Sequence, residues 1–108
     1  MPSELVKRVP PETIRTIFNN SQYPTLIANG HLAPHMLKDS VLQNPHLRRE
    51  PPGTRSQVIR YFDLAGQWVV EIHQYLRPDG SLGASGKPDP KRLRIAGTIF
   101  IPKSDTAL

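Results

Sequence analysis

The sequence predicts an α+β domain: one or two short N-terminal helices packed on a C-terminal antiparallel sheet of about four strands. Two observations support this class. Strand-like alternation and hairpin turns are concentrated in residues 57–102, whereas helix-like apolar spacing lies within residues 10–45. The 108 residues are expected to form a single domain, with residues 1–9 as a loose arm and residues 103–108 as a tail.

The helical part begins at residues 10–12, Pro-Pro-Glu. Proline is tolerated in the first turn of a helix, and a carboxylate there complements the helix dipole. Ile14, Ile17 and Phe18 follow with the spacing of one helical face, so they form an apolar stripe that docks on the sheet.

Two further elements are expected before residue 46. Residues 25–28 follow a Tyr-Pro step and predict a short edge strand. Residues 34–43 predict a second helix, with Met36, Leu37 and Val41 facing inward and Asn-Pro ending it.

The clearest strand spans residues 67–76, where side chains alternate between two faces. The hairpin turn before it contains Asp63, placed to accept turn hydrogen bonds, and Gly66, suited to a positive φ. Residues 94–98 repeat this arrangement between the last two strands.

One face of the strand at residues 67–76 is predicted to bury Trp68, Val70, Ile72 and Leu76, and the other to present Val69, Glu71, His73 and Tyr75. Two registers fit the first turn: Phe62 opposite Trp68 with Val58 opposite Ile72, or Arg60 opposite Glu71.

Two connections are rich in proline and basic residues. Residues 46–56 are expected to be an extended, exposed connection. Residues 77–90 form a long loop with three glycines, which let a backbone approach a ligand closely. A loop of this length in a small domain is usually functional or disordered, so a flexible linker is the alternative.

The net charge of +5 favours an anionic partner, and nucleic acid is the commonest one. We expect RNA rather than DNA to bind the exposed sheet face and the basic loop. Basic charge that serves only solubility is the alternative. The predicted nucleic-acid ligands are Arg77, Lys87, Lys91, Arg92, Tyr75, Arg48, Arg49 and Arg55.

Glu71 and His73 point the same way from one strand, with side-chain roots about 7 Å apart. In metal-independent RNA cleavage, Glu71 would serve as the general base and His73 as the general acid, with Arg77 or Lys87 holding the phosphate. The carboxylate is expected to favour protonated His73. A polar or salt-linked face without catalysis is the alternative.

A metal site is not expected. His31 and His35 have a zinc-like spacing, but Pro34 lies between them and His46 is the only additional nearby candidate. No cofactor motif is present, and a protein-interaction adaptor or inhibitor is a further functional alternative. The chain has no cysteine, no bilayer-length apolar run and no signal-peptide pattern, so we expect a cytoplasmic protein without a membrane partner.

Overall fold

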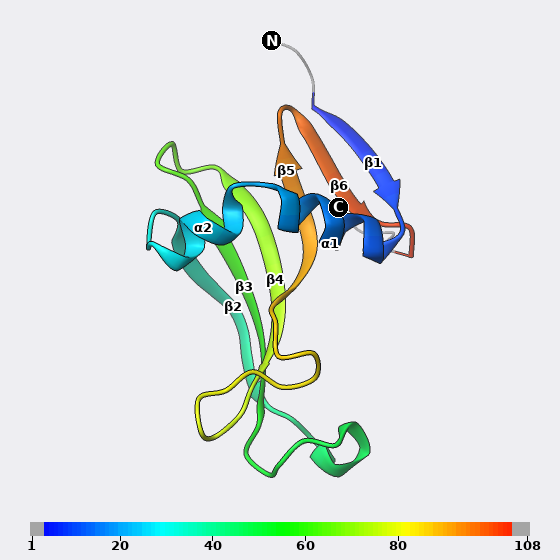
Figure 1. The fold of residues 1–108 in the computed structure, drawn as a ribbon, viewed down its shortest axis with the longest axis vertical. Helices are drawn as coiled ribbons and strands as arrows, with labels where there is room; N and C mark the ends of the chain where they lie inside the picture. Colours follow the sequence, from blue (N-terminus) through cyan, green and yellow to red (C-terminus); the bar gives the residue numbers. More distant parts are fainter. Residues whose placement is uncertain (1–3, 105–108) are drawn as a thin grey trace.

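The computed structural model describes residues 4–104 and shows an α+β fold with two α-helices and a six-stranded mixed sheet (Figure 1). The predicted class is confirmed, but the sheet has six strands instead of about four. The elements are β1 (Leu5–Val9), α1 (Pro11–Asn20), α2 (Tyr23–Ala28), β2 (Ala33–Val41), the 3₁₀ helix η1 (Pro45–Arg48), β3 (Arg55–Phe62), β4 (Trp68–Leu76), β5 (Asp89–Ile95) and β6 (Thr98–Pro102).

The strand order is β1-β6-β5-β4-β3-β2, in which β1 is parallel to β6 and all other neighbours are antiparallel. The expected loose arm is therefore wrong for Leu5–Val9, because these residues pair with Thr98–Pro102. Residues 1–3 of that arm and residues 105–108 of the expected tail lie outside the described residues.

The predicted first helix is confirmed, and its apolar stripe docks on the sheet. Ile14 and Phe18 are buried, and Ile17 packs against the same core. Residues 25–28 are helical in α2, not an edge strand. The chain turns back along the core there, and Leu26 and Ile27 pack against it from a helical turn.

The second predicted helix is wrong, because Ala33–Val41 forms the edge strand β2. Its antiparallel pairing with β3 satisfies backbone groups along almost the whole segment, which outweighs the weak helical spacing. Met36, Leu37 and Val41 are consequently exposed instead of facing a core.

The centre of the core lies between the helices and strands β4 and β5. Val70, Ile72 and Leu93 are almost completely buried there, as the alternation predicts for the first two. A bulge interrupts the β3–β4 register between Tyr61 and Phe62.

Because of this bulge, each predicted register describes one part of the hairpin. Phe62 pairs with Trp68, yet Arg60 pairs with Glu71, whereas the expected pairing of Val58 with Ile72 is absent. Trp68 and Val69 also differ from their expected faces, because Val69 is buried and Trp68 is only partly buried. Leu76 is likewise only partly buried at the end of the strand.

Both hairpin turns form near the expected residues. Asp63 Oδ1 accepts hydrogen bonds from the Ala65 and Gln67 N–H groups, and Gly66 has φ +80°. The last turn is tighter than expected. Ala96 and Gly97 have φ values of 50° and 79°, as a two-residue type I′ turn requires.

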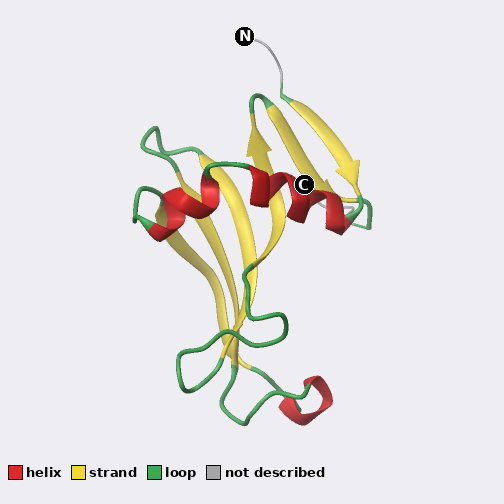
Figure 2. Cartoon of the chain, viewed as in Figure 1, coloured by secondary structure: helices red, strands yellow, loops and turns green. Residues whose placement is uncertain are grey.

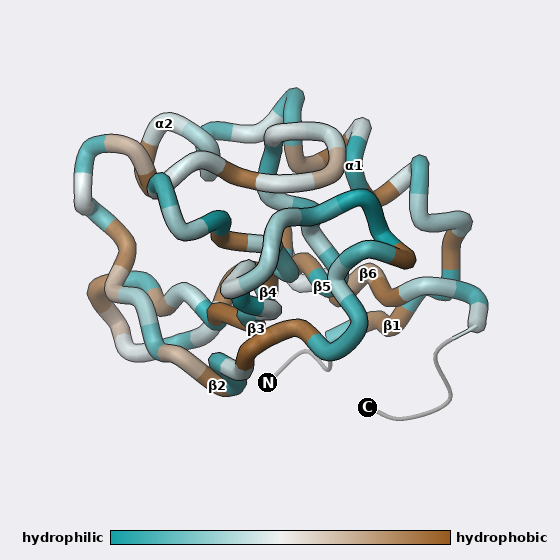
Figure 3. The backbone as a smooth tube through the Cα atoms, turned by 90° about the horizontal axis from the view of Figure 1, so that it is seen from below, coloured by the Kyte–Doolittle hydropathy of each residue, from teal (hydrophilic) through white to brown (hydrophobic). Residues whose placement is uncertain are grey.

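Both helices lie on one side of the sheet when the molecule is seen from below (Figure 3). We call the opposite side the open face. The loops 42–54 and 77–88 lie together at one end of β3 and β4, and that end carries the 3₁₀ helix (Figure 2). The open face and this loop end position the candidate site.

We expect Leu93→Ala to lower the free energy of unfolding by roughly 2–5 kcal/mol, because Leu93 is 0% exposed and truncation leaves a cavity. The matched control is Leu64→Ala, since Leu64 is 100% exposed in a turn and should change stability by less than about 0.5 kcal/mol. Urea unfolding of both variants measures this difference. Equal losses would contradict the assigned core.

Candidate functional site

The open face brings together several of the predicted residues. Cross-strand partners share a face, so the pairs Ser56–Tyr75 and Val58–His73 place both aromatic side chains there. The His73 and Tyr75 rings meet edge to face with centroids 4.7 Å apart. The Arg48 guanidinium from η1 lies over the Tyr75 ring, 5.8 Å from its centroid. The aromatic pair therefore has a cation beside it from a distant part of the chain.

His73 is partly buried, and a hydrogen bond of 3.0 Å joins its Nε2 atom to Ser56 Oγ. Burial lowers the pKa of His73 below its usual value. Lys91, Lys38 and Arg48 lower the pKa further by cationic repulsion, while Asp89 opposes them. The expectation of a favoured protonated form is wrong, because burial and the surrounding cations outweigh the nearby carboxylate. His73 is thus a predominantly neutral imidazole near neutral pH.

Glu71 lies on the same face but is held by arginines. Its Oε1 atom is 2.7 Å from Arg60 Nη2, and its Oε2 atom is 3.9 Å from Arg92 Nε. The side chain is only 13% exposed. The Glu71 carboxylate therefore has a structural role as an ion-pair partner. To act as a general base it would have to leave Arg60.

Trp68 forms a second cluster on the open face that the sequence prediction missed. The guanidinium carbons of Arg60 and Arg94 lie 5.3 Å and 4.5 Å from the Trp68 ring centroid. Arg94 also forms an ion pair of 2.9 Å with Glu4. These arginines are engaged by aromatic and acidic partners, so this part of the face is a structural cluster. Part of this cluster could have been predicted from the sequence. The alternative register places Arg60 opposite Glu71, and therefore on the same face as Glu71.

Arg77, predicted as a phosphate ligand, is bound to a buried carboxylate instead. Its Nε and Nη2 atoms donate to the two carboxylate oxygens of Glu50 at 2.7 Å and 3.1 Å. Glu50 also accepts from the Ala84 N–H at 3.3 Å. The Glu50 side chain is 2% exposed. One carboxylate therefore joins the segment after η1 to both ends of the 77–84 loop.

The loop is built closely around Glu50. A Cβ atom at Gly83 would overlap the Glu50 carboxylate, so only glycine fits there without a shift. The Arg77 guanidinium holds the pKa of Glu50 below its usual value, although burial opposes this. The carboxylate is consequently ionised at neutral pH, and this contact is lost as the pH falls through the lowered pKa. Its role could not be read from the sequence, because Glu50 is a lone acid in a basic segment.

The remaining predicted cations are separated by the fold. Arg55 pairs with Asp39 at 2.7 Å, and Lys91 pairs with Asp89 at 2.7 Å beside His73. Arg49 is exposed and follows η1, with a left-handed φ of 57°. Lys38, which was not predicted, lies in the row of Val58 and His73 across β2, β3 and β4.

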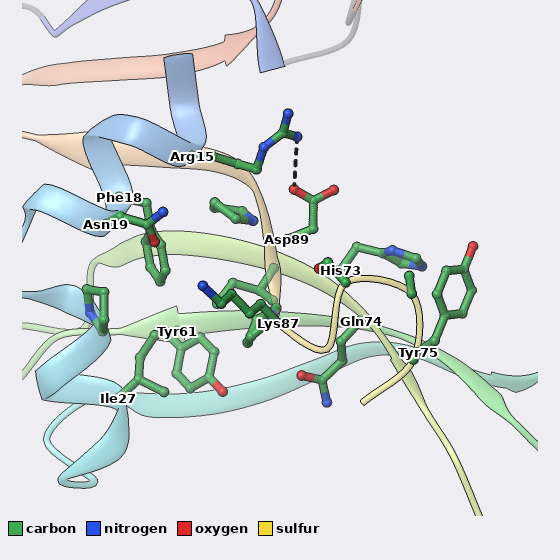
Figure 4. A pocket seen from close by; sticks show the side chains of 17 residues that line it. Arg15, Phe18, Asn19, Ile27, Tyr61, His73, Gln74, Tyr75, Lys87 and Asp89 are labelled. Carbon is green, nitrogen blue, oxygen red and sulfur yellow. Dashed lines mark ion pairs between the residues drawn. The ribbon is translucent and has the colours of Figure 1, made fainter. Parts of the chain in front are cut away.

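Lys87 lies apart from the open-face cations. Its side chain lines a cavity of ≈ 830 Å³ between the helices, the sheet and residues 83–90, and it points away from the His73 imidazole (Figure 4). The predicted phosphate ligands are thus divided between the open face and the helix-covered side.

The described residues contain no group of three or more potential metal ligands. His31 follows α2 in a loop, and His35 lies on β2 with its ring 6.3 Å from Phe62. Ala33–Val41 is a strand, so the two histidines do not share a helical face. No helix in the described part of the chain is long and apolar enough to span a bilayer.

Comparison with protein-family models, curated proteins and solved structures gave no significant match. The function is therefore inferred from the chain's own residues and their geometry. The features that bear on it are the His73–Tyr75 pair, with Lys38, Arg48 and Lys91 around it, and the cavity.

We expect the His73 environment to make stability depend on pH. The unfolded chain takes up a proton at His73 as the pH falls through about 6.5, whereas the folded chain needs a lower pH. Below about 6.5 the unfolded state binds more protons, so unfolding becomes easier as the pH falls. His73→Gln should flatten this dependence between about pH 7 and 5.

The measurement is urea unfolding at several pH values, with His46→Gln as the control because His46 is exposed. The control should retain the dependence of the parent chain. An equally steep dependence in His73→Gln would show that His73 titrates alike in both states.

Proposed function

We propose that the protein binds single-stranded RNA on its open face, around the His73–Tyr75 pair. The observation that carries this proposal is the convergence of cations on that pair from separate elements. Lys38 on β2, Arg48 on η1 and Lys91 on β5 all lie close enough to act on the His73 charge. A surface that gathers like charges around partly exposed aromatic rings favours a polyanion that also carries flat rings.

The phosphates are assigned to the three cations. Arg48 and Lys38 are exposed, and Lys91 has a single carboxylate partner that is itself shared with Arg15. Bringing phosphates to these side chains relieves the repulsion between them and releases counterions, so binding should weaken with salt. The arginines around Trp68 are not included, because Glu71 and Glu4 already balance them.

Tyr75 supplies the stacking surface. Its ring is partly exposed, and the T-shaped contact with His73 fixes its orientation. Base stacking on an aromatic ring needs unpaired bases, which favours a single strand over a duplex. The neutral His73 supports this arrangement, since it adds no further repulsion among the cations.

RNA cleavage is the second possible activity of this face, because Glu71 and His73 point the same way. The roles first assigned to them find little support, since Glu71 is held by Arg60 and His73 favours its neutral form. Binding without cleavage is therefore proposed. The test is to incubate the protein with labelled RNA in EDTA and to compare it with the double variant Glu71→Gln, His73→Gln. Cleavage by the parent chain above the level of the double variant would contradict binding without cleavage.

The binding test pairs two double variants that remove the same charge. Lys38→Ala with Lys91→Ala should weaken binding of a short mixed-sequence RNA and reduce its salt slope by about 1.4, at about 0.7 per phosphate contact. Lys7→Ala with Lys103→Ala is the control, because these exposed lysines belong to the opposite end of the sheet order. Fluorescence anisotropy across a salt series measures both.

Two outcomes would contradict the proposal. Equal losses in the two double variants would show a response to net charge alone. Failure of the parent chain to bind RNA would leave a protein-interaction role as the better interpretation.

A further inference from the structure

The cavity on the helix-covered side meets the proposed RNA surface at His73 and Tyr75, which also line it, but its remaining lining has no role in RNA binding as proposed. It lies under α1 and α2 and is closed on one side by residues 83–90, with a volume of ≈ 830 Å³ (Figure 4). Its apolar walls include Phe18 from α1, Ile27 from α2 and Ile72 from β4. This size and composition are typical of small-molecule sites, which combine apolar walls with a few polar groups.

Three of the polar side chains that line these walls have groups open to a ligand. The Lys87 side chain extends into the cavity from the loop (Figure 4), and no ion pair of Lys87 is found among the described residues. The Tyr61 hydroxyl makes no hydrogen bond within residues 4–104, and burial raises the pKa of this phenol, so it stays protonated. Gln74 donates its amide N–H to Gln57 Oε1 at 2.9 Å, which leaves its own carbonyl oxygen as an acceptor.

The charge of the cavity is unbalanced. Asp89 is the only acidic side chain lining it within the described part of the chain. Its two oxygens are already 3.6 Å from Arg15 Nη1 and 2.7 Å from Lys91 Nζ. Lys87, which is exposed, is therefore left to a ligand or to solvent at the edge of the apolar walls.

We propose that this cavity binds a small organic carboxylate with a flat apolar body and one hydrogen-bond donor. The apolar body fits between Phe18 and Ile27, the carboxylate pairs with Lys87, and the donor reaches the free Gln74 oxygen. The Tyr61 hydroxyl provides a second hydrogen bond to the polar end. Glu50 accepts from the Ala84 N–H, so the start of the loop that carries Lys87 is fixed beside the cavity before a ligand arrives.

Indole-3-propionate is a suitable probe, because it has a flat body, an N–H donor and a carboxylate. Its uncharged amide, indole-3-propionamide, is the matched ligand. Isothermal titration calorimetry should give the carboxylate an affinity about tenfold higher than the amide, as expected for a charge-assisted hydrogen bond. Lys87→Ala should lower the carboxylate affinity about tenfold and leave the amide affinity unchanged.

Two controls separate this site from general charge and from the RNA surface. Lys103→Ala removes the same charge far along the chain and should bind both ligands like the parent protein. Lys87→Arg should retain most of the preference for the carboxylate. RNA affinity should change less in Lys87→Ala than in Lys38→Ala with Lys91→Ala, because the Lys87 side chain extends away from the Tyr75 ring although both residues line the cavity (Figure 4).

Ile27→Trp tests the location, since the larger ring occupies the cavity and should weaken both ligands about tenfold or more. A melting curve like that of the parent chain establishes that the variant is folded. The proposal is overturned if the probe does not bind, if Lys87→Ala keeps the tenfold preference, or if folded Ile27→Trp binds both ligands unchanged.

Discussion

The ion pair between Glu50 and Arg77 determines the geometry of both surfaces to which a function is assigned. Glu50 is almost fully buried, and its oxygens accept from Arg77 and from the Ala84 N–H group. Through it, the segment that follows η1 is joined to the loop between β4 and β5. Arg48 then lies over Tyr75 on the open face, while the same loop carries Lys87 to the cavity. A buried carboxylate without these partners would be costly, so the two loops are fixed together.

The sheet separates two kinds of chemistry. Helices α1 and α2 cover one face, and their contact with the strands leaves a cavity with apolar walls and one unbalanced cation. The other face is uncovered and carries rows of polar and cationic side chains, partly balanced by Glu71 and Glu4. The bulge between Tyr61 and Phe62 contributes to this separation. It shifts the register opposite Trp68 and Val69, and at this point Trp68 lies beside the arginines of the open face while Val69 is buried.

The sequence predicts the elements whose signal is local. The α1 stripe, the Asp63 turn and the Val70–Ile72 alternation are confirmed, since each depends on residues a few positions apart. The strand nature of β1 and β2 could not be predicted in the same way, because it comes from pairing with distant strands. Likewise, the alternation in the sequence predicted that Glu71, His73 and Tyr75 share one face. It did not predict the ion pair between Glu71 and Arg60 or the burial that lowers the His73 pKa, because both depend on distant residues.

The central claim is that RNA binds the open face at His73 and Tyr75. A two-dimensional NMR titration of the isotope-labelled protein with short single-stranded RNA tests it most directly. The account predicts that the largest shifts fall on Lys38, Ser56, His73, Tyr75 and Lys91, while the amides of α1 and α2 change little. Shifts confined to the helices, or spread evenly over all basic residues, would contradict it.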